Sequence, residues 1–217
     1  MLVILASSYD SEAVALAARY GGEAVGLLTP ADLSLPGWKY QPGNVAAGSA
    51  VVNAHVVQVS AIDGVLGFLA GVHPAELHHI VPEDREYVAA EMNAFLYAWL
   101  SELPIRVMNR PAGGSLCGPA WSLERWKWAA GSIGVRISDR VHPSGATERV
   151  TVVCETAFGD VNAALKDAAL RLAKAAQVEV LTATFCSGTF VSASTRADTT
   201  IDGVDAALRD AFAVSRT

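Results

Sequence analysis

Continuous apolar runs alternate with helical patterns in the first half of the chain. Residues 2–6 and 24–28 are short apolar runs, and between them apolar residues recur at helical spacing over residues 11–20. A run that is apolar at every position is typical of a parallel strand covered on both faces, and the helical spacing predicts an amphipathic helix. The beginning of the chain therefore predicts a β-α-β unit.

The strongest helical pattern follows Pro82. Its apolar face is formed by five residues: Val88, Met92, Phe95, Trp99 and Leu103. Spacings of three and four residues place them on one side of a helix, and the acidic residues just before them favour a helix start there. Pro104 ends the helix, and residues 105–108 predict a strand that leads into a loop with Asn109 and Arg110.

The second half repeats the alternation more regularly. A helix is predicted over residues 122–132, and the segment 139–148, which contains Pro143 and Gly145, is the predicted linker. Beyond it we expect a strand, a helix, a hairpin and a closing helix, in this order: residues 149–155, 161–176, 178–194 and 204–212. The pattern predicts two lobes, residues 1–138 and residues 149–217.

The composition narrows the functional classes. Although 52% of the residues are hydrophobic, every apolar run is shorter than the ~20 residues that cross a bilayer, so we expect no membrane span and a cytoplasmic protein. The net charge of −6 argues against nucleic acid as a partner, because no basic stripe is present. Cys117, Cys154 and Cys186 are odd in number and lack metal-ligand spacing, so buried, reduced thiols are expected.

Three segments carry a resemblance to a known family. They are VSAIDGVLG at residues 59–67, REYVAAEMNAFLYAWLSELPIRVMNRP at 85–111 and LRLAKAAQVEVLTATFCSGTFVSAST at 170–195. In this order they resemble parts of the ATP-grasp ligase superfamily, in the branch that includes peptide- and ribosomal-protein-modifying amino-acid ligases. The resemblance implies an α/β fold with a pre-ATP-grasp-like open sheet, flanking helices and a small C-terminal α/β hairpin lobe.

The chain departs from this family where the family holds ATP. The family inserts a nucleotide-clamping subdomain with two lysines between these regions, whereas here only residues 135–148 stand there and no lysine occurs between Lys127 and Lys166. The family's hairpin also presents an Asp and a Glu-x-Asn that bind two magnesium ions. The matching positions of this chain hold hydroxyl residues: Thr182, Thr184, Ser192, Ser194 and Thr195.

These substitutions bear directly on catalysis. Magnesium needs oxygen ligands that are mostly carboxylates, and neutral hydroxyls do not supply them. The resemblance therefore implies a truncated protein in which the ATP chemistry has been lost. We expect no catalytic residue, no bound metal and no cofactor.

Asn109 and Arg110 are the predicted ligand-binding residues. They follow a predicted strand of an open α/β sheet, at the edge where ligands characteristically bind, and a guanidinium binds carboxylate or phosphate in bidentate fashion. In the alternative, Arg110 pairs with a structural acid and Asn109 caps a turn. The adjacent His78 and His79 would point to different sides of a regular element, which favours a surface loop over a metal site.

Two functions are consistent with these observations. The first is a non-catalytic, degenerate ATP-grasp-like protein that acts as a binding or accessory subunit. The alternative is a small ATP-dependent ligase or transferase whose nucleotide site is assembled across a dimer. We expect a homo-oligomer because loss of a subdomain exposes apolar surface. A protein partner is also expected if one of the clustered Trp121, Trp126 and Trp128 points outward.

Overall fold

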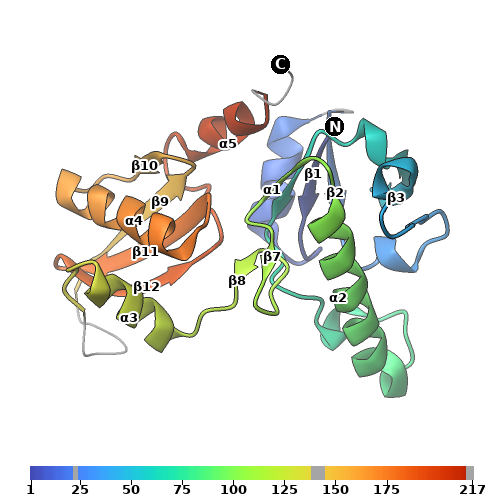
Figure 1. Cartoon of the computed structure of the whole chain (residues 1–217), viewed down its shortest axis with the longest axis horizontal. Helices are drawn as coiled ribbons and strands as arrows, with labels where there is room; N and C mark the ends of the chain where they lie inside the picture. Colours follow the sequence, from blue (N-terminus) through green and yellow to red (C-terminus); the bar gives the residue numbers. More distant parts are fainter. Residues whose placement is uncertain (22–23, 138–144, 214–217) are drawn as a thin grey trace. The chain divides into compact units, whose positions relative to one another are not determined.

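The computed structural model describes residues 1–21, 24–137 and 145–213. It divides the chain into two compact units, which we call unit 1 (Met1–Gly118) and unit 2 (Pro119–Val214). Each unit combines its own sheet with helices (Figure 1), so the predicted mixed α/β fold class is confirmed. Among the described helices, none has the length and hydropathy that a membrane crossing requires.

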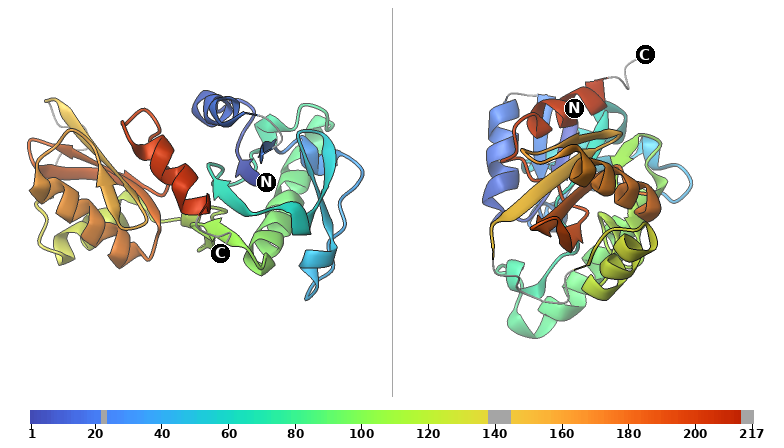
Figure 2. Two further views of the ribbon diagram at one scale, coloured as in Figure 1. Left: turned by 90° about the horizontal axis from the view of Figure 1, so that it is seen from above. Right: turned by 90° about the vertical axis from the view of Figure 1, so that its left-hand side faces the viewer.

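Unit 1 is built on a four-stranded parallel sheet with the strand order β2-β1-β5-β6. Its strands are β1 (Leu2–Leu5), β2 (Val25–Leu28), β5 (Gly64–Gly67) and β6 (Arg106–Met108). Most residues of these strands are buried, because helices cover both faces of the sheet. Figure 2 shows α1 (Ser11–Tyr20) and α2 (Arg85–Glu102) on its two sides. The apolar runs of β1 and β2 are explained by this cover on both faces, as the sequence predicted.

Helix α2 supplies the centre of the unit 1 core. Met92 and Trp99 of the predicted apolar face are buried, and Val88 and Phe95 of the same face pack against the cluster around them. Leu96 is fully buried as well, so the buried stripe is broader than the predicted one.

The chain between β2 and β5 forms an irregular segment that folds over α2. We call this segment the excursion. It contains 3₁₀ turns and a hairpin of β3 (Ser49–Val52) with β4 (His55–Gln58). Asn53 and Ala54 form the two-residue turn with φ of 51° and 60°, the backbone that a type I′ hairpin needs. The usual Gly at the second turn position is absent, so the sequence carries no strong hairpin signal here.

Unit 2 is built on a four-stranded antiparallel sheet with the strand order β10-β9-β11-β12. Its strands are β9 (Thr147–Val153), β10 (Thr156–Phe158), β11 (Val180–Cys186) and β12 (Thr189–Ser194). Helix α4 packs on β9, β10 and β11, and α3 packs on β12 and α4. Figure 1 shows these two helices together along the sheet, and α5 apart from them. The helices are α3 (Leu123–Ser132), α4 (Ala163–Ala176) and α5 (Val204–Ala213).

The division between the units differs from the predicted one. The chain divides after Gly118, within the short strand β8 (Gly118–Pro119) that pairs with β7 (Pro111–Ala112), and not at the predicted linker 139–148. The reason is that α3 packs against β12, which comes some 60 residues later in the chain. Most of the predicted linker, residues 139–144, lies outside the described residues.

Candidate functional site

The β11–β12 hairpin carries hydroxyl residues that the resemblance aligned with magnesium-binding positions. The two strands are antiparallel, with Thr182 opposite Ser194 and Thr184 opposite Ser192. Ser187 and Gly188 form the turn with φ of 50° and 72°, so the hairpin predicted over residues 178–194 is confirmed. One extra residue on β12, between Phe190 and Ser192, interrupts the register as a bulge.

The sheet of unit 2 has one apolar face, and its other face carries most of the hydroxyl side chains of the sheet. Val150, Val152 and Leu181 belong to the apolar cluster that packs with α3 and α4. Side chains alternate along a strand, so the residues between them point to the opposite side. We call this side the hydroxyl face, and its members are Thr151, Thr182, Thr184, Ser192 and Ser194.

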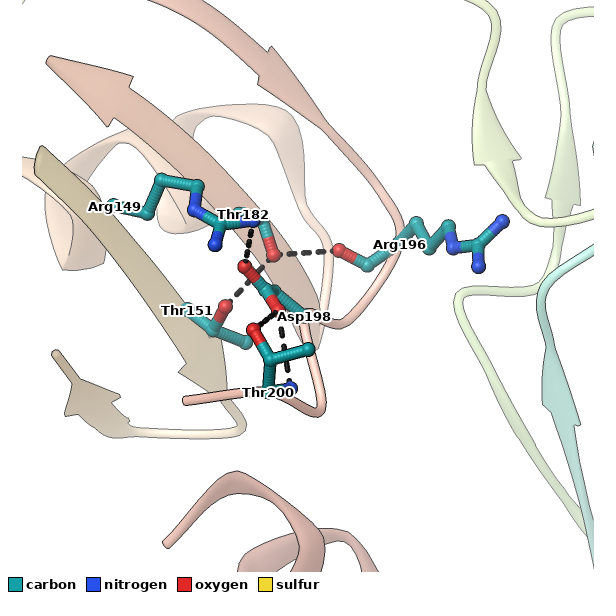
Figure 3. A network of polar contacts seen from close by, with 6 residues as sticks. All are labelled: Arg149, Thr151, Thr182, Arg196, Asp198 and Thr200. Carbon is teal, nitrogen blue, oxygen red and sulfur yellow. Dashed lines mark hydrogen bonds and ion pairs between the residues drawn. The ribbon is translucent and has the colours of Figure 1, made fainter. Parts of the chain in front are cut away.

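The central hydroxyls of this face are bonded within the chain (Figure 3). The Thr182 hydroxyl donates to the carbonyl oxygen of Arg196 at 2.7 Å, and it lies 2.8 Å from the hydroxyl of Thr151. A hydroxyl has a single proton, so Thr151 donates in the second bond and Thr182 accepts. Thr151 is fully buried. These two side chains therefore tie the segment after β12 to the middle of the sheet.

Asp198 anchors the same segment from its other end (Figure 3). Its carboxylate forms an ion pair with the Arg149 guanidinium of β9. It also accepts hydrogen bonds from the Thr200 amide at 3.1 Å and from the Thr200 hydroxyl at 2.5 Å. The Asp198 side chain is 8% exposed, and that of Arg149 is 52% exposed. This buried carboxylate is thus committed to structural partners beside the hydroxyl face.

A hollow of about 720 Å³ opens beside Arg149. Its walls include Phe158 of β10, Lys166 of α4 and the segment around Asp202. Cations and carboxylates both line it, since Glu148 and Asp202 stand with Arg149 and Lys166. The hollow therefore offers an aromatic wall and mixed charge, and not a uniformly cationic surface for a polyphosphate.

The donor set of the hydroxyl face is unlike that of a magnesium site. Magnesium is bound through carboxylate oxygens in proteins, whereas the paired positions here offer neutral hydroxyls. In the described ranges, no three His, Cys, Asp or Glu side chains come together in a way that could hold a metal ion. The arrangement stabilises a polar sheet face, and it does not present the charge that would offset a phosphate.

Arg110 is placed by the structure at the end of α2. Its guanidinium donates to four main-chain oxygens, those of Leu100 (2.8 Å), Ser101 (3.3 Å), Leu103 (2.9 Å) and Ile105 (2.7 Å). The last carbonyls of a helix have no partner within it, and a cation there is favourable. These bonds favour a structural role for Arg110. Its partners are backbone carbonyls, however, and not the structural acid that the alternative interpretation expected.

Asn109 lies before Arg110, buried and with φ of 55°. Such a backbone is more accessible to Asn than to most residues, which agrees with a turn position. Ligand binding by Asn109 and Arg110 stays a prediction, and nothing in the contacts of Arg110 adds to it.

The other candidate side chains have separate partners. The His79 ring lies 2.7 Å from the Ser34 hydroxyl, and His78 makes an edge contact with Tyr9 at 6.1 Å. The three cysteines are free thiols, with Cys117 and Cys186 buried and Cys154 half-buried. The two adjacent histidines therefore have local structural contacts, as the surface-loop interpretation predicted.

The geometry of both units agrees with solved structures of one class of enzyme. No protein-family model matches the chain, and no curated protein matches it. Its fold is that of RiPP-associated ATP-grasp ligases. The macrocyclase MdnC from Microcystis aeruginosa MRC, bound with precursor peptide MdnA, matches with a TM-score of 0.71 at 10% identity over 97% of this chain and 98% of that chain.

Two further structures show the same likeness. The ATP-grasp ligase PsnB, complexed with minimal precursor, Mg and ADP, has a TM-score of 0.67 at 11% identity over 100% of this chain and 97% of that chain. A Chryseobacterium gregarium RiPP-associated ATP-grasp ligase, in complex with ADP and a leader and core peptide, has 0.60 at 9% identity, over 99% and 95%. At these identities the likeness establishes the fold alone. The predicted ATP-grasp-like resemblance is confirmed at that level.

The sequence reasoning missed the ion pair of Arg149 with Asp198. These residues are 49 positions apart, and only the folded sheet brings them together. The local signal was the spacing of Asp198 and Thr200, since an Asp often accepts from the amide two residues on.

Proposed function

We propose that this chain is a non-catalytic, degenerate ATP-grasp-like protein that acts as a binding or accessory subunit. The observation that carries the proposal is the hydroxyl face. Thr184 lies opposite Ser192 and Thr182 opposite Ser194 on the hairpin, so four neutral side chains stand where magnesium-bound ATP requires carboxylates. The Thr182 hydroxyl is in addition occupied by Thr151 and the Arg196 carbonyl.

The proposal includes the loss of a nucleotide-clamping subdomain. Only residues 133–146 separate the end of α3 from the start of β9. Fourteen residues are too few for a subdomain with its own core, since even small autonomous domains need roughly 40 residues. With no clamp on one side and no metal on the other, the phosphates of ATP would have no dedicated partner.

The proposed binding function is directed at peptides. Two of the structural neighbours hold a bound peptide: MdnC is bound with precursor peptide MdnA, and the Chryseobacterium gregarium ligase is in complex with a leader and core peptide. We propose that this chain keeps a peptide-binding role of the fold after loss of the chemistry, acting as a cytoplasmic homo-oligomer or beside a partner enzyme.

The hollow beside Arg149 favours a second candidate function. Arg149 and Lys166 both line it, and two cations could hold phosphates if another copy of the chain supplied the missing clamp. This second candidate is a small ATP-dependent ligase or transferase whose nucleotide site is assembled across a dimer. It is weakened by the ion pair of Arg149 with Asp198, which already neutralises one of the two cations.

Thermal unfolding of the full chain with Mg²⁺ and ATP tests the proposal. A site with micromolar Kd would add about 4 kcal/mol of stability at millimolar ATP, whereas the proposal predicts no change beyond that caused by MgCl₂ alone. A rise in Tm that needs ATP and Mg²⁺ together would contradict it. Sedimentation with and without ATP separates the second candidate, which predicts a dimer that nucleotide strengthens.

A further inference from the structure

A ladder of aromatic rings and one guanidinium runs from the core of unit 2 to its surface at α3. Buried Trp126 contacts Trp121, with ring centroids 4.6 Å apart and the two ring planes tilted by 56°. The guanidinium carbon of Arg125 lies 5.0 Å from the Trp121 ring and 4.9 Å from the Trp128 ring. Trp128 is 63% exposed. Arg125 therefore contacts two indoles at the outer end of this ladder, and one of them, Trp128, is exposed beside it.

The guanidinium of Arg125 retains its hydrogen-bonding capacity. Stacking uses the flat faces of a guanidinium and leaves the N–H donors in its plane. Within the described chain, the Arg125 side chain makes no hydrogen bond and no ion pair. Its sequence neighbour Glu124 is engaged elsewhere: hydrogen bonds from the Ser122 hydroxyl and from its own backbone amide lower the pKa of its carboxyl, and Lys127 lowers that pKa further.

The surface around the ladder is basic in an otherwise acidic protein. The helices α3 and α4, which cover the same face of the sheet, carry five cations: Arg125, Lys127, Lys166, Arg171 and Lys174. They carry only two carboxylates, Glu124 and Asp167, and one of these pairs with Arg171 at 2.8 Å. The two helices thus have a net charge of +3 in a chain of net charge −6. A partner of opposite charge is favoured at this surface and disfavoured by the rest of the chain.

We propose that the outer surface of α3 binds an acidic peptide segment in which an Asp or Glu stands next to an apolar residue. The carboxylate pairs with the free in-plane donors of Arg125, and the apolar side chain covers the outer face of Trp128. Trp and Arg are the residue types most enriched among residues that dominate binding energy at interfaces. Lys127 of the same helix contributes at the rim through charge alone.

This inference rests on the proposed binding function and gives it a surface and a ligand class. The ladder and the hydroxyl face lie on opposite sides of the same sheet, because α3 packs with the apolar cluster. Binding of ATP at the hydroxyl face would therefore overturn the proposed function without deciding whether a peptide binds at α3. The two claims fail in different experiments.

Isothermal titration of the full chain with an acetylated, amidated peptide of alternating Glu and Phe tests the inference. We expect binding that weakens about tenfold or more in Arg125→Gln and in Trp128→Ala, since each change removes an interaction of about 1–2 kcal/mol. Arg125→Lys keeps the charge but loses the planar stack, and it should also weaken binding. A peptide with Gln in place of Glu should bind about as weakly as the Arg125→Gln protein binds the acidic one.

Matched controls come from exposed residues of unit 1. Tyr87 is 69% exposed, and Lys39 is exposed as well. The control variants Tyr87→Ala and Lys39→Gln should bind the acidic peptide as tightly as the unaltered chain does. The inference is overturned if the unaltered chain does not bind the peptide, or if binding is unchanged in both α3 variants. It is equally overturned if sedimentation shows that Trp128→Ala dissociates an oligomer, because the occupant would then be a second copy of the chain.

Discussion

In unit 1, the side chains of Asp32 and Arg110 bind mostly main-chain groups, whereas polar side chains at the centre of unit 2 also bind one another across a sheet face. Asp32 accepts from the Thr29 and Ala54 amides, and Arg110 donates to the last carbonyls of α2. In unit 2, Thr151 bonds to Thr182 and Arg149 pairs with Asp198. The first kind of contact closes loops and helix ends, and the second keeps a polar surface ordered.

This difference separates a sheet that is buried on both sides from a sheet with hydroxyl side chains on one side. The parallel sheet of unit 1 is apolar on both faces and has no polar surface to lose. The antiparallel sheet of unit 2 instead carries opposed hydroxyl side chains on one face, and the proposed loss of catalysis rests on them. Predictions for unit 1 therefore concern stability, and those for unit 2 concern binding.

The largest effect is expected for Asp32→Ala. Asp32 is buried and accepts three hydrogen bonds of 2.8 Å, from the Thr29 amide, the Thr29 hydroxyl and the Ala54 amide. Donors left without an acceptor lower the free energy of unfolding by about 3 kcal/mol in total. Urea unfolding followed by tryptophan fluorescence measures the loss, and Asp32→Asn, which keeps one acceptor oxygen, should lose less. Equal stability of the Ala variant would show that the excursion is not anchored by this carboxylate.

A smaller loss is expected for Arg110→Ala. Its four bonds to carbonyl oxygens cap α2, but the side chain is exposed, so water replaces part of the interaction. We expect a decrease of about 1–2 kcal/mol in the free energy of unfolding. Arg110→Lys keeps the charge but lacks the planar set of donors. Its free energy of unfolding should lie between those of the unaltered chain and of Arg110→Ala. An unchanged Tm of Arg110→Ala would contradict the structural role and would favour the ligand-binding hypothesis for Arg110.

The smallest effect on stability, and the sharpest on binding, is expected for the double variant Thr184→Asp/Ser192→Glu. These residues stand opposite each other on β11 and β12, and like charges there lower stability by about 0.5–1 kcal/mol. Added Mg²⁺ should restore it, because paired carboxylates are hard ligands. The uncharged Thr184→Asn/Ser192→Gln serves as the control. If the unaltered chain is stabilised by Mg²⁺ to the same degree, the hydroxyl face was not the barrier to metal binding.

The sequence predicted those elements of the fold that are determined by a single short segment of the chain. The apolar run at residues 2–6 became β1 (Leu2–Leu5), and Ser187 with Gly188 formed the turn of the predicted hairpin. The hairpin around Asn53 and Ala54 was missed because its turn lacks the Gly that marks such turns. The boundary after Gly118 was missed because it depends on the packing of α3 against β12.

The candidate site was predictable only in part. The register confirms that the four hydroxyl positions stand in opposed pairs, since alternation along a strand can be read from the sequence. The partners of Arg110 and the pairing of Arg149 with Asp198 could not be read in this way, because a charged side chain has many partners of similar energy. Which of them it meets is decided by the packing of elements distant in sequence.

Equilibrium dialysis of ADP with Mg²⁺ against the full chain tests the central claim most directly. The hydroxyl face is expected to bind no magnesium nucleotide, because its side chains supply no carboxylate: Thr182, Thr184, Ser192 and Ser194. We therefore expect equal ADP concentrations in the two compartments at millimolar Mg²⁺, for the unaltered chain and for Thr184→Asn/Ser192→Gln alike. Retention of about one ADP per chain, dependent on Mg²⁺, would contradict the account.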